Sequence, residues 1–151
     1  MRIDAVQGWI GGLLRAGPEF PGGSLLLDDG TYPKTPGREH ALSTQGLCLI
    51  LWQIESDGLV DETDKGACIE RLSLPVVIEE NVSVCRGPTG IQIPAEKALR
   101  LVREALVGKR PDGEPGVVLR CANPPFKNFG NQNGVQRIVA LFTLDLPIVP
   151  V

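Results

Sequence analysis

In residues 135–146, VQRIVALFTLDL, every second residue from Ile138 to Leu146 is apolar. The apolar positions on one side are Ile138, Ala140, Phe142, Leu144 and Leu146. Alternation with a period of two is typical of a β-strand that turns one face to the core. The preceding Asn133-Gly134 pair favours a tight hairpin turn. This stretch therefore predicts the second strand of a long hairpin in an antiparallel sheet.

The first strand of that hairpin is predicted at residues 117–122, VVLRCA. Residues 123–134, NPPFKNFGNQNG, are predicted as a loop that carries two aromatic side chains among polar ones. Exposed aromatic residues in a loop often anchor a partner surface, although such a loop could also fold back onto its own sheet. We expect contact residues at Phe126, Lys127, Asn128 and Phe129.

Two further strands are predicted upstream. Residues 47–54, LCLILWQI, are apolar on both faces, which is typical of a short strand covered on both sides. Residues 67–84 alternate and predict a long strand that the segment 79–82 closes or bends. Pro75 cannot donate to a ladder, so an edge or a bulge is expected there. Between these strands, residues 55–66, ESDGLVDETDKG, predict an acidic hairpin-type loop.

Two amphipathic helices are predicted from the 3.6-residue spacing of apolar side chains. The first covers residues 3–16 and ends at Gly17-Pro18. The second begins at Pro94, which suits a first turn, and ends before Gly108, which suits a left-handed cap. Residues 17–41 are rich in proline, glycine and aspartate and predict a long, ordered, turn-rich segment, in which 24–27 could form a short strand.

These segments predict an α+β fold with one antiparallel or mixed β-sheet, two main helices and long ordered loops. The expected order of elements is α-β-β-α-β-β. Helices and hairpin-paired strands of this kind form layers around one core. A chain of 151 residues suits a single domain over residues 1–151.

No pattern in the sequence predicts a catalytic, metal or cofactor site. The four cysteines lack the short spacing of zinc or redox sites, and they are Cys48, Cys68, Cys85 and Cys121. The glycines do not match a phosphate-binding loop, and the acidic clusters do not match a calcium loop. We therefore expect no enzyme activity, no cofactor and no metal. No apolar run is long enough for a membrane span, and the N-terminus does not read as a signal peptide.

Three other interpretations stay open. His40, the single histidine, could serve Cys85 or Cys121 as the base of a nucleophilic enzyme, although no known triad spacing supports this. The chain could be a ligand-binding or peptide-binding accessory module with one deep apolar pocket. The basic residues of the second helix could contact an acidic partner, although a net charge of −3 argues against broad nucleic-acid binding.

The order of four segments and their apolar patterns resemble those of one protein family. They are LCLILWQIE at 47–55, ERLSLPVVIEENVSV at 70–84, PAEKALRLVREALVG at 94–108 and QRIVALFTLDLPI at 136–148. Preceded by an amphipathic helix, this order resembles the tail-terminator (tail-completion, or minor tail) proteins of long-tailed bacteriophages and tail-like particles. The segments at 17–41 and 123–134 look longer than the family pattern.

The resemblance implies a non-enzymatic virion assembly protein, made in the host bacterial cytoplasm and located at the neck of the particle. Such a protein forms a ring, expected to be a hexamer, that caps the tail tube, docks to the head-tail connector and lets DNA pass. Another layer of the neck is an alternative. We expect contacts through residues 18–41, 57–65 and 123–134. In the first of these segments the expected contact residues are Tyr32, Pro33, Lys34 and Arg38.

Overall fold

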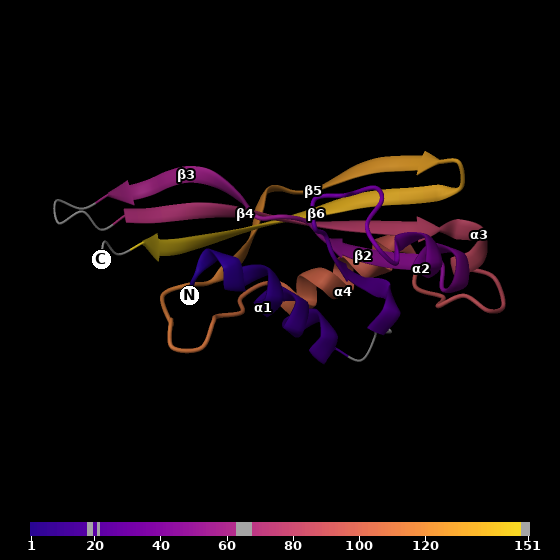
Figure 1. The fold of residues 1–151 in the computed structure, drawn as a ribbon, viewed down its shortest axis with the longest axis horizontal. Coiled ribbons are helices and arrows are strands. Elements are labelled where there is room, and N and C mark those ends of the chain that lie inside the picture. Colours follow the sequence, from indigo (N-terminus) through magenta and orange to yellow (C-terminus); the bar gives the residue numbers. More distant parts are fainter. Residues whose placement is uncertain (18–19, 21, 63–67, 149–151) are drawn as a thin grey trace.

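The computed structural model describes residues 1–17, 20, 22–62 and 68–148. Within them the chain forms four helices and one open, mixed sheet of six strands (Figure 1). The predicted α+β class with a single sheet is therefore confirmed. None of the described helices has the length and apolar character needed to cross a membrane.

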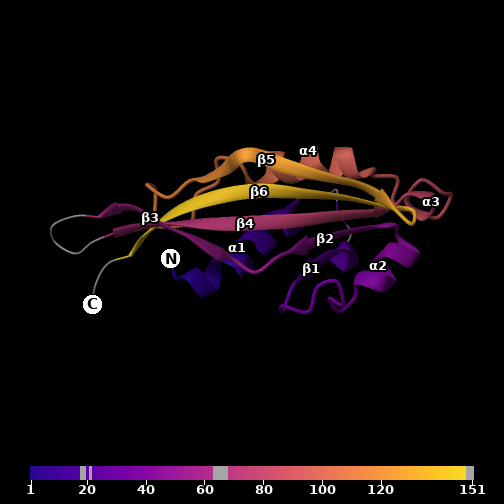
Figure 2. The same cartoon turned by 90° about the horizontal axis from the view of Figure 1, so that it is seen from above.

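The sheet has the order β1-β2-β4-β6-β5, and its strands lie side by side in Figure 2. β1 (Leu25–Leu27) runs parallel to β2 (Leu47–Leu51), and the other neighbours are antiparallel. β4 (Cys68–Asn81) and β6 (Val135–Ile148) pair over their full lengths with no register shift. β5 (Leu119–Gln132) follows β6 as the last strand of the order, and one of its edges is open.

The two long helices cover the same face of the sheet (Figure 1). They are α1 (Ile3–Ala16) and α4 (Ala95–Leu106), both as predicted. Their apolar stripes pack on alternate residues of β2, β4 and β6 to form the main core. The cap of α4 is also as predicted, because Gly108 follows the helix with a φ of 83°.

A smaller apolar cluster lies on the opposite face of the sheet, under the short helix α2 (Arg38–Thr44). Ala41 and Leu42 of that helix pack with the remaining side chains of β2, which is buried along its whole length. The prediction of a strand covered on both sides is confirmed for residues 47–51, whereas residues 52–54 of the predicted stretch lie outside the strand. A fourth helix, α3 (Val82–Cys85), is a single turn that begins where β4 ends.

The prediction of a loop at residues 55–66 is wrong, because residues 55–62 form strand β3 (Glu55–Glu62). β3 pairs with the first half of β4, with register shifts at Ser56/Gly58 and Leu59/Asp61. Backbone pairing with a long neighbour outweighs the poor strand propensity of aspartate and glycine. The expected contact segment 57–65 therefore lies on a strand as far as residue 62, and its residues 63–65 lie outside the described part.

The prediction of a loop at residues 123–134 is also wrong. Strand β5 continues through the double proline to Gln132. Its ladder with β6 shifts register between Cys121 and Phe126 and again between Asn128 and Gly130. Bulges of this kind accommodate residues that a regular ladder excludes. The turn at Asn133-Gly134 is as predicted, and both residues have positive φ values, 54° and 84°.

Residues 17–41 are only partly the predicted loop. A short 3-10 turn at Gly22–Ser24 leads into β1, so a strand does form within the stretch 24–27. Residues 28–37 are a loop, and α2 then begins at Arg38, where no helix is predicted. Residues 18, 19 and 21 of the expected contact segment lie outside the described part.

Pro75 lies in the middle of β4, at the place where the neighbour on one side changes from β2 to β3. On β4, the pairing with β2 ends at Val76 and the pairing with β3 begins at Ser73. The carbonyl of Pro75 accepts a hydrogen bond from the Trp52 backbone N–H at 3.1 Å. Pro75 has no N–H to donate, and the side of β4 on which it would donate is the gap between β2 and β3. This agrees with the expected irregularity.

Candidate functional site

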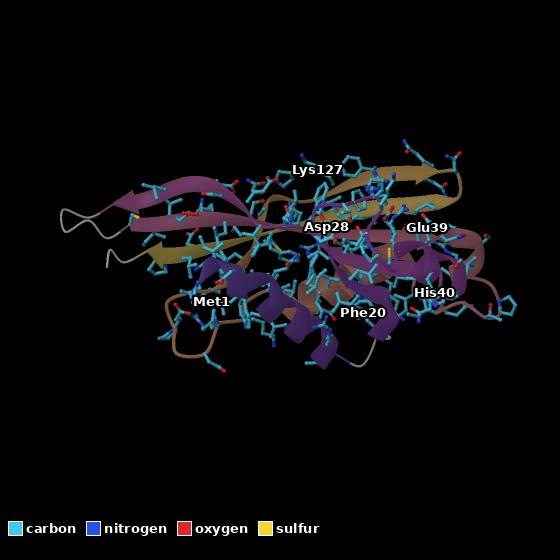
Figure 3. The ribbon with its side chains drawn as sticks, in the orientation of Figure 1. Met1, Phe20, Asp28, Glu39, His40 and Lys127 are labelled. Carbon is cyan, nitrogen blue, oxygen red and sulfur yellow. The ribbon has the colours of Figure 1, made fainter. Side chains whose placement is uncertain are left out.

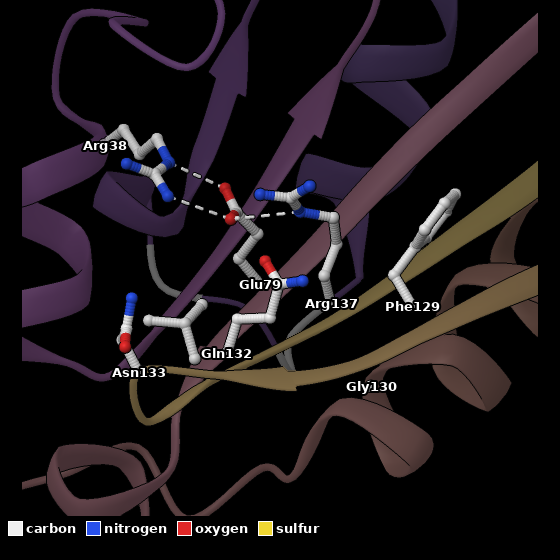
Figure 4. A pocket seen from close by; sticks show the side chains of 8 residues that line it. Arg38, Glu79, Phe129, Gly130, Gln132, Asn133 and Arg137 are labelled. Carbon is white, nitrogen blue, oxygen red and sulfur yellow. Dashed lines mark hydrogen bonds and ion pairs between the residues drawn. The ribbon is translucent and has the colours of Figure 1, made fainter.

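A buried ion pair lies on the face of the sheet that carries α2 (Figure 4). The Glu79 side chain, on β4, is fully buried. Arg38, the first residue of α2, binds it in a two-pronged arrangement, with Nε 2.7 Å from Oε1 and Nη2 2.9 Å from Oε2. Hydrogen bonding to Glu79 raises the pKa of the Arg38 guanidinium. The pair fixes the start of α2 against the sheet.

A second arginine approaches the same carboxylate. Arg137 Nε, on β6, lies 3.5 Å from Glu79 Oε2. This nitrogen is buried and makes no hydrogen bond with any described residue. Both oxygens of Glu79 already accept hydrogen bonds from Arg38. Arg137 therefore contributes positive charge that Glu79 compensates only in part.

Tyr32 lies close to both arginines and is held there by Asp28. The buried Asp28 carboxylate accepts from the Tyr32 backbone N–H and from Thr35 Oγ1, each at 3.2 Å. The guanidinium carbons of Arg38 and Arg137 lie 5.9 and 5.6 Å from the centre of the Tyr32 ring, within cation–π range.

The ring of Tyr32 also makes an edge contact with Trp52, at 5.4 Å between ring centres. Its hydroxyl is buried and has no hydrogen bond to a described residue. Burial, and after it the charge of Glu79, raises the pKa of Tyr32 to about 12. The phenol is therefore neutral at physiological pH and keeps an unused donor close to the ion pair.

A pocket of about 290 Å³ opens beside the ion pair, toward the end of the β5–β6 hairpin (Figure 4). Its walls come from α2, β4, β5, β6 and the hairpin turn, and its charged lining residues are Arg38, Glu79 and Arg137. Phe129 forms an apolar side of the pocket and is 54% exposed. Two guanidinium groups and one buried carboxylate make this pocket suited to an anionic group.

The structure brings together some of the predicted contact residues and separates others. Tyr32 and Arg38 lie in the ion-pair cluster, and Phe129 lines the pocket beside it. Pro33 and Lys34 are exposed in the loop before α2. Figure 3 shows Lys127 on β5, on the far side of the sheet from Met1. The predicted residues therefore belong to one face of the sheet, with two exceptions.

Phe126 and Asn128 are the exceptions. Phe126 pairs with Ala140 and Asn128 with Ile138, and these partners belong to the main core on the helix-covered face. Paired residues in an antiparallel ladder share a face. Phe126, which is 38% exposed, and Phe129 therefore flank the edge of β5 from opposite faces, instead of sharing one loop tip as predicted.

A second fully buried acid has a structural role. Glu80 follows Glu79 on β4 and therefore points to the other face of the sheet. Its Oε1 accepts from the Ala95 backbone N–H at 2.9 Å, and its Oε2 accepts from Arg86 Nε at 2.9 Å. A carboxylate at this position satisfies a free N–H at the start of α4 and complements the helix dipole.

The geometry gives no support to the cysteine nucleophile. Cys85 is buried, and its Sγ donates to the Ile93 carbonyl oxygen at 3.2 Å. Burial raises the pKa of Cys85 to about 11, the direction opposite to an activated thiolate. No hydrogen bond or ion pair joins His40 to Cys85 or Cys121 among the described residues. Nor do those residues contain a group of three or more potential ligands positioned for a metal.

Sequence reasoning missed Glu79, Glu80 and Arg137 as members of these clusters. A signal was present, because two adjacent glutamates end a long apolar strand. Neighbouring residues of a strand point to opposite faces, so a strand that is covered on both sides buries both acids. Buried acids need cationic partners. The sequence does not reveal which arginines supply them.

No protein-family model matches this chain, and no curated protein sequence matches it.

Proposed function

We propose that this protein is a non-enzymatic virion assembly protein, a ring-forming tail terminator at the head-tail junction of a long-tailed bacteriophage or a related particle. In this role it caps the tail tube, docks to the head connector and leaves a lumen through which DNA passes. The proposal starts from the resemblance in the order of elements. It needs surfaces through which identical subunits can join.

The observation that carries the proposal is the open edge of β5 between Phe126 and Phe129. The two phenylalanines lie on opposite faces of the sheet, and both are substantially exposed. A segment that lay along this edge would be held between two aromatic side chains. The bulge at Asn128/Gly130 interrupts the regular backbone edge, so the aromatic contacts would supply much of the binding energy.

The positions of the hairpins agree with a ring. The β3–β4 and β5–β6 hairpins lie at opposite ends of the long axis (Figure 1). Leu59 and Val60 on β3 are 57% and 44% exposed. Exposed apolar residues at two separate places on one chain favour a head-to-tail contact, and such contacts close into rings when the rotation between subunits allows it.

The experiment compares the wild-type chain with the double variant Phe126→Ala/Phe129→Ala. The native mass is measured by sedimentation, and larger species are imaged by negative-stain electron microscopy, with and without assembled tail tubes. We expect wild-type rings, free or on the tube ends, and a loss of assembly of at least about tenfold in the variant. The fold should be retained because both side chains are exposed.

The matched control is Ile3→Ala/Val107→Ala, which also removes two exposed apolar side chains, 42% and 45% exposed, but on α1 and after α4. It should assemble as the wild type does. If the phenylalanine variant assembled normally, the β5 edge would not be the contact. A wild-type chain that stayed monomeric and ignored tail tubes would remove the proposed function and favour the ligand-binding module.

A further inference from the structure

We propose that the pocket at Arg38 and Arg137 is a carboxylate-binding socket for a second copy of this chain, whose acidic strand β3 it receives. The inference rests on the proposed function in that it assumes assembly from identical subunits. It adds which two surfaces meet and which charges they use.

The socket has binding capacity that the chain itself leaves unused. Besides its cation–π contact with Tyr32, Arg137 has one ion-pair contact, to Glu79, and its buried Nε lacks a hydrogen bond within the described chain. The exposed Glu39 pairs with Arg38 Nη1 at 2.8 Å, but it does not line the pocket. A carboxylate that entered beside Arg137 would give this guanidinium the second oxygen partner that its planar donors favour.

The size and lining of the pocket suit a side chain. A volume of about 290 Å³ lies at the low end of the range for small-molecule sites. It accommodates one acidic side chain with part of its backbone. Phe129 offers an apolar surface at the same opening, so a matching segment should carry an acid with an apolar residue close to it.

Strand β3 has that composition. Glu55 and Asp57 are exposed and form no ion pair with a described residue, and Leu59 and Val60 follow as exposed apolar residues. The cation opposite this part of β3, Arg71, donates through both Nε and Nη2 to Asp145. Arg71 also interacts electrostatically with Asp57, but both of these hydrogen bonds go to Asp145, so Glu55 and Asp57 keep no ion-pair partner among the described residues.

The relative positions exclude a contact within one chain. The pocket lies beside the end of the β5–β6 hairpin, and β3 extends to the other end of the molecule (Figures 1 and 4). An acidic strand at one end and a cationic socket at the other can meet only between copies. Such a contact is head-to-tail, the type from which rings are built.

A charge exchange tests the contact. Asp57→Arg and Arg137→Glu are made singly and together in the full chain, and the dissociation constant for self-association is measured by sedimentation velocity. Each single variant should associate at least about tenfold more weakly, because like charges then face each other. The double variant restores opposite charges across every contact and should recover most of the wild-type affinity.

Two further variants separate docking from folding. Arg137→Glu places a carboxylate beside Glu79, which puts the fold at risk. Arg137→Gln removes the charge with less risk to the fold. Asp57→Arg changes a residue far from the ion-pair cluster. Lys97→Glu, an exposed charge reversal on α4, is the matched control and should associate as the wild type does.

Single variants that associate normally, or a double variant no better than the singles, would overturn the socket and leave the proposed function standing on the β5 edge. A wild-type chain that stays monomeric up to about 1 mM would also overturn it. Charge-dependent association that yields open filaments and ignores tail tubes would support the socket and count against the proposed function.

Discussion

Arg38 and Glu79 form a two-pronged ion pair across the α2–β4 contact, and the carboxylate in it is fully buried. Removal of one partner from such a pair leaves an uncompensated charge in the interior. Arg38→Met should therefore lower the free energy of unfolding by about 3–5 kcal/mol, measured by urea denaturation. Glu39→Ala, at the exposed neighbour that also contacts Arg38, should change it by no more than about 0.5 kcal/mol.

Replacement of both partners of the ion pair tests whether the loss of stability comes from an unpaired buried charge. Arg38→Met/Glu79→Leu removes both charges and fills the space with apolar atoms of similar volume. Because the desolvation cost of both ions is then removed, the double variant should regain most of the stability that Arg38→Met loses. If the double variant were as unstable as Arg38→Met, the loss of Glu79 as the partner of Arg137 would cost as much stability as the loss of Arg38 as the partner of Glu79.

Glu80 caps the first turn of α4, and its loss should destabilise that helix. Glu80→Ala removes the acceptor of the Ala95 N–H and the partner of Arg86, at a cost of about 1–3 kcal/mol. Hydrogen exchange of the α4 amides should report the opening of that helix first. Glu96→Ala is the control, because its 3.8 Å contact with Arg86 is exposed and should contribute little.

Gly46 is confined by the backbone of Cys85. A Cβ at residue 46 would lie 2.2 Å from the Cys85 nitrogen, and the φ of Gly46 is 83°. Gly46→Ala should cost about 2–5 kcal/mol through overlap and backbone strain together. Gly108 has the same φ of 83° in open space, so Gly108→Ala should show the strain alone, about 1–2 kcal/mol. Thermal unfolding of both variants separates the two effects.

The thiol of Cys85 should be unreactive in the folded protein. Burial, and after it the charge of Glu80, raises its pKa from 9.0 to about 11. At pH 8 about one thiol in a thousand is ionised, so a thiolate-dependent reagent should label Cys85 far more slowly than the partly exposed Cys121. Rapid labelling of Cys85 at neutral pH would contradict its burial and reopen the nucleophile hypothesis.

The same shift sets an alkaline limit to stability. The folded state keeps the neutral thiol to higher pH than the unfolded chain does. The resulting stabilisation is complete below pH 9 and is lost as the pH rises from 9 toward 11. Urea denaturation at a series of pH values should therefore show a falling free energy of unfolding in this window. Tyr32, whose pKa is also raised by burial, acts in the same direction at higher pH.

The elements that follow simple periodic patterns could be predicted from the sequence. The helices at 3–16 and 95–106 and the strands that carry Leu49, Val76 and Phe142 owe their positions to apolar faces that must be buried together. α2 was missed because it buries only Ala41 and Leu42, too few residues for a recognisable period. β3 and the second half of β5 were missed because a long partner strand imposes their conformation on unfavourable residues.

The candidate site was predictable only in pieces. Tyr32, Arg38 and Phe129 were predicted as contact residues in loops. In the structure, all three lie near the ion pair that Arg38 forms with Glu79, 41 positions away in the sequence. The pairing of a buried acid with distant arginines depends on strand register. Register depends on bulges at positions that local composition does not specify.

The uninterrupted ladder between β4 and β6 also has a mechanical consequence. Fourteen consecutive residue pairs run along the long axis of the molecule without a register shift. Tension along that axis would load these hydrogen bonds in shear, all at once, because they stand perpendicular to the strands. The break between β2 and β3 at Trp52 leaves the neighbouring part of the sheet free to yield instead. A subunit built in this way would stretch little from end to end, and would bend sideways where Pro75 faces that break.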